Sequence, residues 1–319
     1  MVFALFVAFA VVASAAVALF MYWSVKSREG RNIWPVVFAI MVAGIVAVVA
    51  YTNYIGISWF FFTSVAVAAL SSMLPVLYRR RSMAFALVIF VLAFAAAISL
   101  NRMATMGMFG VGTVVGMLYS ERYLIRKRED RSMRKTVTEM RRDLIQVIGG
   151  VVVLAIMFLW QQSYLYILFW VILLAYLFIS LISKTGGIYN LLSKFERRES
   201  EFGIGAIHLA AGAAILLGFA GFKLALFGIF PLFFGDALAT MTGLSFYRSR
   251  KLPYNRRKSY AGTIAFLIAS VVPGFIILGF WGILLGLILT LVESVELPID
   301  DNIAVPIGTV ILGALFGLG

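Results

Sequence analysis

Residues 234–306 carry the pattern from which the fold and chemistry of this chain are predicted. Their polar residues fall in three segments: FGDALATMTGLSF (234–246), RKLPYNRRKSYAG (250–262) and LVESVELPIDDNIAVP (291–306). The surrounding sequence is so apolar that each carboxylate needs a physical reason to be there. Asp236 is the plainest case, because the nearest basic residues are Lys223 and Arg248. An ionisable group at membrane depth is costly, so Asp236 is a candidate functional residue.

The composition of the chain predicts a protein that crosses a membrane many times. Of its 319 residues, 63% are hydrophobic and 13% are charged, and the mean hydropathy is +1.02. Such a composition is typical of polytopic membrane proteins. The absence of cysteine excludes a disulfide framework, a thiol nucleophile and a cysteine metal site. The single histidine, His208, leaves little room for a histidine metal cluster or a catalytic triad and is interpreted as structural.

Apolar runs of about 17–25 residues, the length that crosses a hydrocarbon core of about 30 Å, recur along the whole chain. The expected spans are 2–23, 33–52, 56–78, 83–100, 103–120, 144–160, 163–182, 203–221, 224–246, 261–279, 280–293 and 303–318. Span 280–293 is short and is alternatively tilted, half-buried or re-entrant. The predicted fold is an all-α, polytopic transmembrane helix bundle of about 12 spans. The first span is expected to be retained, because no basic segment precedes it.

Lysine and arginine residues are concentrated on one side of these predicted spans. The loops of that side are 24–32, 79–82, 121–143, 183–202, 247–260 and 294–302, and they hold all but two of the 27 basic residues. Only Arg102 and Lys223 fall on the other side. This asymmetry predicts cytoplasmic charged loops and an N-terminus outside. The net charge of +13 is then explained by topology and anionic lipids, and a nucleic-acid polymer is not an expected partner.

Three parts are predicted along the chain. Residues 1–120 form an N-terminal region of five spans, residues 121–143 form a basic amphipathic segment on the cytoplasmic surface, and residues 144–319 form a catalytic module of seven spans. In that module Asp236 is expected roughly 15 Å from the cytoplasmic end of its span, at 1.5 Å per residue. Pro231 and Gly235 precede it and are expected to break the helix beside a polar cavity. The alternative is a structural Asp that pairs across helices.

Charged groups of several loops are expected to meet at the cytoplasmic face of this module. Carboxylates and asparagine supply hard oxygen ligands for Mg²⁺ or Mn²⁺, which usually bind one or two carboxylates plus substrate phosphates, and basic residues complement phosphate charge. The candidate metal ligands are Asp236, Glu293, Asp300 and Asp301. The candidate nucleotide-binding residues are Lys251, Arg256, Arg257, Lys258 and Asn302. Together they favour a metal–nucleotide complex that meets a lipid substrate. Glu293 is alternatively the polar end of a short span.

In order and spacing, these residues resemble the CTP-dependent polyprenol kinases, the family of dolichol kinase and phytol kinase, which is distantly related to phosphatidate cytidylyltransferases. The resemblance covers roughly residues 139–319. It rests, in chain order, on Glu196–Arg197, Gly235, Asp236, Ala239, Gly243, Phe246, Leu252–Pro253, Lys258–Ser259, Gly262–Thr263, Glu293, Asp300, Asp301, Asn302 and Pro306. One departure concerns the family's Arg-Lys-x-x-His segment. Here Arg142 keeps the arginine, but Gln146 stands at the histidine position.

The resemblance implies transfer of the γ-phosphate of CTP to the hydroxyl of a long-chain isoprenoid alcohol at the cytoplasmic face. Asp236, and after it Asp301, would be the catalytic residues, as base or metal ligand. Lys258 would clamp a phosphate and Asn302 would orient the metal or nucleotide. The remaining nucleotide-binding candidates are Gly235, Lys251, Arg256, Arg257, Ser259 and Gly262, and the supporting residues are Arg142, Gln146, Glu196 and Arg197.

Two other functions fit parts of the pattern. A cytidylyltransferase would use the same CTP but attack its α-phosphorus, and a transporter would also carry a buried Asp near a broken helix. A P-loop kinase is excluded, because the chain has no Walker A sequence. The sequence does not name the alcohol and leaves a homo-oligomer open. The expected location is the cell membrane in a prokaryote or the endoplasmic reticulum in a eukaryote.

Overall fold

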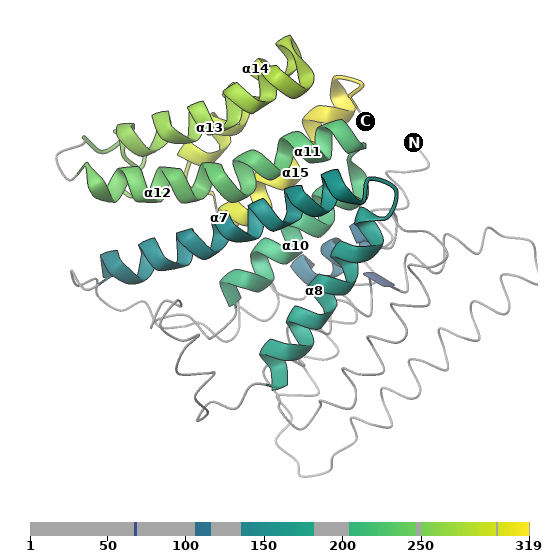
Figure 1. The fold of residues 1–319 in the computed structure, drawn as a ribbon. Coiled ribbons are helices and arrows are strands. Elements are labelled where there is room, and N and C mark those ends of the chain that lie inside the picture. Colours follow the sequence, from purple (N-terminus) through teal and green to yellow (C-terminus); the bar gives the residue numbers. More distant parts are fainter. Residues whose placement is uncertain are drawn as a thin grey trace, which may run out of the picture. The chain divides into compact units, whose positions relative to one another are not determined.

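The computed structural model describes residues 67–68, 106–115, 135–181, 204–246, 250–297 and 299–318. Regular structure in these ranges is helical, which confirms the all-α prediction, and Lys251 and Ser259 form an isolated antiparallel bridge. The helices labelled in Figure 1 are α7 (Lys135–Leu159), α8 (Tyr164–Leu181), α10 (Ile204–Phe219), α11 (Phe222–Ile229), α12 (Asp236–Ser245), α13 (Tyr260–Leu278), α14 (Phe280–Ser294) and α15 (Asp301–Leu315). A π-helical segment, η3 (Phe230–Gly235), lies between α11 and α12. Most of the predicted N-terminal region 1–120, much of segment 121–143 and the pair Glu196–Arg197 lie outside the described residues.

The contacts divide the chain into two compact units. The first contains Met1–Arg128 and Phe169–Leu181, and the second contains Glu129–Leu168 and Ile182–Gly319. In the first unit Phe109 packs edge-on against Phe169 at a ring distance of 5.5 Å. The second unit carries every described residue of the candidate site.

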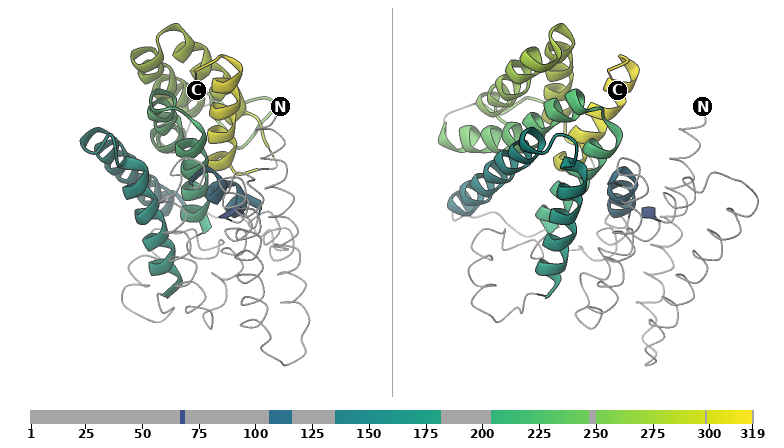
Figure 2. Two further views of the ribbon diagram at one scale, coloured as in Figure 1. Left: turned by 90° about the vertical axis from the view of Figure 1, so that its right-hand side faces the viewer. Right: turned by 45° about the vertical axis from the view of Figure 1, so that its right-hand side comes forward.

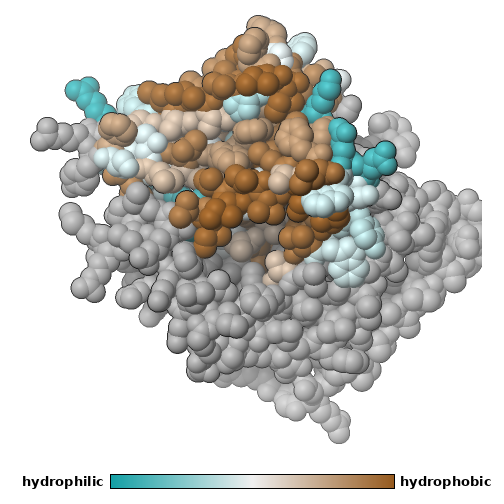
Figure 3. All heavy atoms as spheres, in the orientation of Figure 1, coloured by the Kyte–Doolittle hydropathy of each residue, from teal (hydrophilic) through white to brown (hydrophobic). Residues whose placement is uncertain are grey.

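Three helices of the described part are long and apolar enough to cross a membrane: Arg142–Leu159, Phe222–Ser245 and Tyr260–Leu278. They coincide with the predicted spans 144–160, 224–246 and 261–279. Shorter apolar helices occur at Met106–Val115, Gly205–Phe219, Phe280–Ser294 and Asp301–Leu315. Large apolar side chains remain exposed along these helices, and Figure 3 shows them over much of the described surface. Such surfaces suit a hydrocarbon environment, and the helices indicate a membrane protein.

The helix that carries Asp236 is continuous from Phe222 to Ser245, but its middle turn is a π-helix. The backbone N–H of Asp236 donates to the carbonyl of Pro231, five residues earlier. Pro231 has no N–H and lies in the first turn of the π segment, where the wider turn accommodates its ring. The sequence predicted a break at Pro231 and Gly235, whereas the structure widens the helix without interrupting it. Single π turns of this kind are frequent at functional sites.

Close glycine contacts bring together the helices that carry the site. Helices α13 and α14 lie side by side, as do α10 and α15 (Figure 2). A Cβ on Gly282 would lie 1.9 Å from the carbonyl oxygen of Gly274, and a Cβ on Gly212 would lie 1.9 Å from the carbonyl oxygen of Asn302. Side chains at these positions would therefore force the backbones apart. Gly212 in particular sets the distance between α10 and the first turn of α15.

We expect Gly212→Ala to destabilise the protein, because the added methyl overlaps the Asn302 carbonyl and overpacking of this kind costs about 1–3 kcal/mol. Gly149→Ala in α7 is the matched control. Its Cβ would meet Phe233 at 3.5 Å, an ordinary contact, and alanine has the higher helix propensity. Thermal unfolding in detergent measures both variants. Equal unfolding temperatures for the two would contradict this account of the α10–α15 contact.

Candidate functional site

The site lies where helix ends and connecting loops of the second unit meet. Asp236 is the first residue of α12, and the loop 250–259 leads from α12 into α13. Helix α13 runs away from this loop and α14 returns, so that Glu293 in the last turn of α14 lies back at the loop. Asp301 then begins α15. The topology thus gathers residues that are far apart in the sequence, such as Asp236 and Asp301, which are 65 positions apart.

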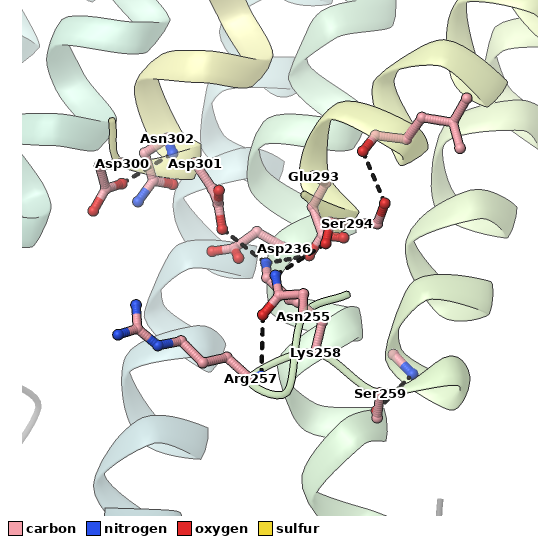
Figure 4. Close-up of polar contacts among 12 residues, drawn as sticks. Asp236, Asn255, Arg257, Lys258, Ser259, Glu293, Ser294, Asp300, Asp301 and Asn302 are labelled. Carbon is pink, nitrogen blue, oxygen red and sulfur yellow. Dashed lines mark hydrogen bonds and ion pairs between the residues drawn. The ribbon is translucent and has the colours of Figure 1, made fainter. Parts of the chain in front are cut away.

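Lys258 is the hub of this arrangement (Figure 4). Its Nζ donates to Oε1 of Glu293 and, at 2.8 Å, to Oδ2 of Asp301. Glu293 is only 1% exposed, and Lys258 is half-buried. Burial alone would lower the pKa of Lys258, but the two carboxylates outweigh it and raise that pKa above its ordinary value. The ammonium group therefore stays charged and pairs with two acidic side chains.

Asp236 completes the cluster from the opposite side. Figure 4 shows its carboxylate beside those of Glu293 and Asp301, and the three are close enough to interact through their charges. Nε2 of Gln146, on α7, donates to Oδ2 of Asp236 at 3.2 Å and to the carbonyl of Leu232 at 2.9 Å. Gln146 itself is buried. The structure therefore brings together Asp236, Lys258, Glu293, Asp301 and Gln146, all predicted from the sequence.

Asn255 is a site residue that sequence reasoning missed. Its buried side chain donates from Nδ2 to the carbonyl of Ser294 at 2.9 Å and accepts the backbone N–H of Arg257 at 3.0 Å. Tyr254 adds a hydrogen bond from its hydroxyl to Oγ of Ser294 at 3.0 Å. These contacts attach the loop to the end of α14, so that Lys258 reaches its carboxylates. The available signal was an asparagine in a Pro-Tyr-Asn turn, a residue type that bonds to nearby backbone.

Three of the predicted nucleotide-binding residues, Ser259, Gly262 and Gly235, make structural contacts. Ser259 caps α13, because its Oγ accepts the backbone N–H of Gly262 at 3.2 Å. A Cβ on Gly262 would lie 2.7 Å from the carbonyl oxygen of Ala239, and a Cβ on Gly235 would lie 2.9 Å from Phe266. Close packing and capping account for these residue types, and nucleotide contacts by them stay a prediction.

Asp300 takes a different direction from Asp301. Its Oδ1 caps α15 by accepting the N–H of Asn302 at 3.0 Å, and its Oδ2 lies 3.3 Å from Nδ1 of His208 on α10. Partial desolvation would raise the pKa of Asp300, whose side chain is still 39% accessible, but the hydrogen bond and charge of His208 together with Asn302 outweigh it and lower that pKa to about 2. His208 is thus placed against the start of α15, in keeping with its structural interpretation.

The remaining predicted basic residues lie around the cluster. Arg257 forms an exposed ion pair with Glu296 at 2.7 Å. Arg142 pairs with its neighbour Asp143 at 3.0 Å. Lys251 and Arg256 are exposed on the loop. Arg257 and Arg142 thus pair with acidic residues other than Glu293 and Asp301, the partners of Lys258.

Two buried oxygens test whether the site suits a divalent cation. Oε2 of Glu293 and Oδ1 of Asn302 are buried and have no hydrogen-bond partner. Unpaired buried acceptors are costly, and a hard cation would satisfy them. Within the described ranges, however, no three acidic or histidine side chains are grouped so as to hold a metal by themselves. A cation bound here would therefore need further ligands, such as the phosphates of a substrate.

We expect Lys258→Met to reduce the free energy of unfolding by about 3 kcal/mol, because it leaves the buried Glu293 carboxylate without its counter-charge. Arg257→Met is the matched control. It removes the neighbouring cation from the ion pair with Glu296, in which each side chain is 48% accessible, and such an exposed pair contributes at most about 1 kcal/mol. Denaturant unfolding in detergent compares the two. Equal losses of stability would show that the Lys258 pairs are not buried in the protein.

Comparisons with known proteins connect the chain to two plant proteins. It is 37% identical over 99 residues to a probable phytol kinase 2, chloroplastic, of Glycine max and to a probable phytol kinase, chloroplastic, of Zea mays. Each match covers 25% of this chain, and 34% and 32% of the respective relative, so the chain spans about a third of their length. No protein-family model matches, and no solved structure matches. Over that quarter of its length, the chain is similar to proteins named as probable phytol kinases.

Proposed function

We propose that this chain is a membrane-embedded kinase that transfers the γ-phosphate of CTP to the hydroxyl of a long-chain isoprenoid alcohol. The observation that carries the proposal is the meeting of Asp236, Lys258, Glu293 and Asp301 at the ends of apolar helices. Phosphoryl transfer depends on positioning and charge neutralisation more than on covalent chemistry by the protein. One ammonium group among three carboxylates is suited to a metal–nucleotide complex.

The proposed roles follow from where each group lies. Asp236 accepts the proton of the substrate hydroxyl while the hydroxyl oxygen forms a bond to the γ-phosphorus of CTP. The bond between that phosphorus and the β–γ bridging oxygen breaks, and CDP is released. Lys258 exchanges part of its contact with Glu293 and Asp301 for the nucleotide phosphates. Glu293, Asp301 and Asn302 would hold Mg²⁺ or Mn²⁺, which would neutralise phosphate charge when bound. Lys251 and Arg256 attract the anionic nucleotide from the exposed loop.

The substrate class has support from two directions. The plant relatives are named as phytol kinases, and phytol is a long-chain isoprenoid alcohol. The helices that carry the site also expose apolar side chains on their outer faces, which include Ile148 on α7 and Ile268 on α13. An alcohol whose chain stays in the bilayer presents its hydroxyl at such a site without leaving the membrane. Use of CTP, and the choice between phytol-like and dolichol-like alcohols, rest on the sequence resemblance.

We further propose the topology that places this site in the cytoplasm. About 12 spans with the N-terminus outside put the basic loop 247–260 and the segment 294–302 on the same face, following the distribution of Lys and Arg. Lys258 and Asp301 must share a face to form their ion pair. A cytoplasmic face also gives access to CTP.

The reaction itself is tested with CTP labelled at either the γ- or the α-phosphate. Membranes that contain the protein are incubated with each nucleotide and an isoprenoid alcohol, and the lipid is extracted and counted. We expect lipid-bound label from γ-labelled CTP and none from α-labelled CTP. Lipid-bound α label would identify a cytidylyltransferase instead, and no transfer to any isoprenoid alcohol would refute the kinase and favour a transporter.

Asp236→Asn is expected to reduce kcat by about 10²–10⁴-fold, because the amide can neither accept the substrate proton nor bind a cation well. The protein should remain folded, since the asparagine carbonyl still accepts the Gln146 hydrogen bond and the change removes a charge from an apolar region. Glu296→Gln, which alters an exposed loop carboxylate, is the control with unchanged turnover. Ordinary activity of a folded Asp236→Asn protein would remove the central assignment.

A further inference from the structure

We infer that Gln146 is a positioning residue, whose amide fixes the Asp236 carboxylate to the π turn that precedes it. Gln146 lies on α7, 90 positions before Asp236, and its side chain is buried. Nothing in the proposed reaction uses Gln146 directly, because neither partner of its amide is a reacting atom of the substrate. The catalytic reading of this inference rests on the proposed function, whereas its structural part stands on the contacts alone.

The π turn creates the acceptor that Gln146 binds. In a regular α-helix, the carbonyl of Leu232 would accept the N–H of Asp236, four residues later. Here that N–H donates to Pro231 instead, five residues earlier. The Leu232 carbonyl therefore has room for another donor, and Nε2 of Gln146 supplies it at 2.9 Å. The side chain of α7 thus stabilises the widened turn from outside the helix.

The chemistry of a primary amide explains why this position suits glutamine. An amide nitrogen carries two N–H groups, so a single atom can donate to the Leu232 carbonyl and to the Asp236 carboxylate at once. Both neighbours are acceptors, which also identifies the nitrogen as the atom that faces them. A neutral histidine has only one N–H and would have to give up one of the two partners. Gln146 therefore couples the backbone irregularity to the orientation of the carboxylate.

This coupling predicts a specific defect when the donor is lost. Without it, the Asp236 carboxylate can rotate away from the point where Glu293 and Asp301 face it, while the Lys258 cluster keeps its own contacts. A displaced catalytic group slows the chemical step, and losing a supporting hydrogen bond typically costs about 10–100-fold. Nucleotide affinity should change little, because the phosphate-facing residues are untouched.

The test uses the full-length chain in detergent with Gln146→Met, which keeps the length of the side chain and removes both donors. Gln161→Met, an exposed glutamine just beyond the end of the same helix, is the matched control. We expect kcat to fall about 10–100-fold in Gln146→Met with KM for CTP within about twofold, and no change in Gln161→Met. Gln146→His should retain an intermediate kcat, since it keeps one of the two hydrogen bonds.

A second readout needs no activity. Hydrogen exchange of the peptide that covers residues 230–240, measured without substrate, should be several-fold faster in Gln146→Met than in wild type, because the π turn loses its outside donor. If the wild-type protein transfers no phosphate, the proposed function fails while faster exchange still supports the Gln146 contact. Unchanged exchange, or a folded Gln146→Met enzyme with wild-type kcat, overturns the inference. A proportional fall of kcat and of folded protein would show a purely structural role and would also overturn it.

Discussion

The buried ion pairs of Lys258 are the interaction on which the rest of the site depends. Glu293 is almost completely excluded from solvent, and a carboxylate in that position is tolerated only because an ammonium group reaches it. That requirement constrains the loop 250–259, which Asn255 attaches to the end of α14. It also constrains α15, which must begin where Asp301 can accept the second hydrogen bond. The same ammonium group is also suited to binding phosphate oxygens, and the same carboxylates are suited to binding a cation.

Close helix packing supplies the rigid frame for this electrostatic cluster. In an apolar environment the hydrophobic effect does little to hold helices together, so small residues that permit close van der Waals contact become important. Gly212 brings α10 against the start of α15, and the approach of Gly274 to Gly282 closes the α13–α14 hairpin. The frame fixes where the ends of α14 and α15 lie relative to the loop. The glycines therefore determine the distances between the helices, and the charged side chains determine the chemical character of the site.

Asp236 differs from the other acidic residues in how it is held. Its position depends on a π turn and on a buried amide from a distant helix, not on a counter-charge. A neutral donor orients a carboxylate without cancelling its charge, which suits the role proposed for Asp236. Lys258 and Gln146 thus support neighbouring carboxylates in two ways. Lys258 supplies a shared counter-charge to Glu293 and Asp301, and Gln146 orients Asp236.

The sequence by itself determined the helical class and the apolar segments around residues 144–160, 224–246 and 261–279. It also identified most polar residues of the site, because an ionisable residue in an apolar run is conspicuous and few other ionisable residues lie in these segments. Tertiary structure alone decided which of those residues meet. Spacing along the chain does not distinguish Asp301, which binds Lys258, from Asp300, which faces His208. It likewise does not show that Asn255 anchors the loop, or that Pro231 widens its helix without breaking it. Hydropathy reports the environment of each segment, whereas partner choice depends on how helix ends are brought together across distances that no local pattern encodes.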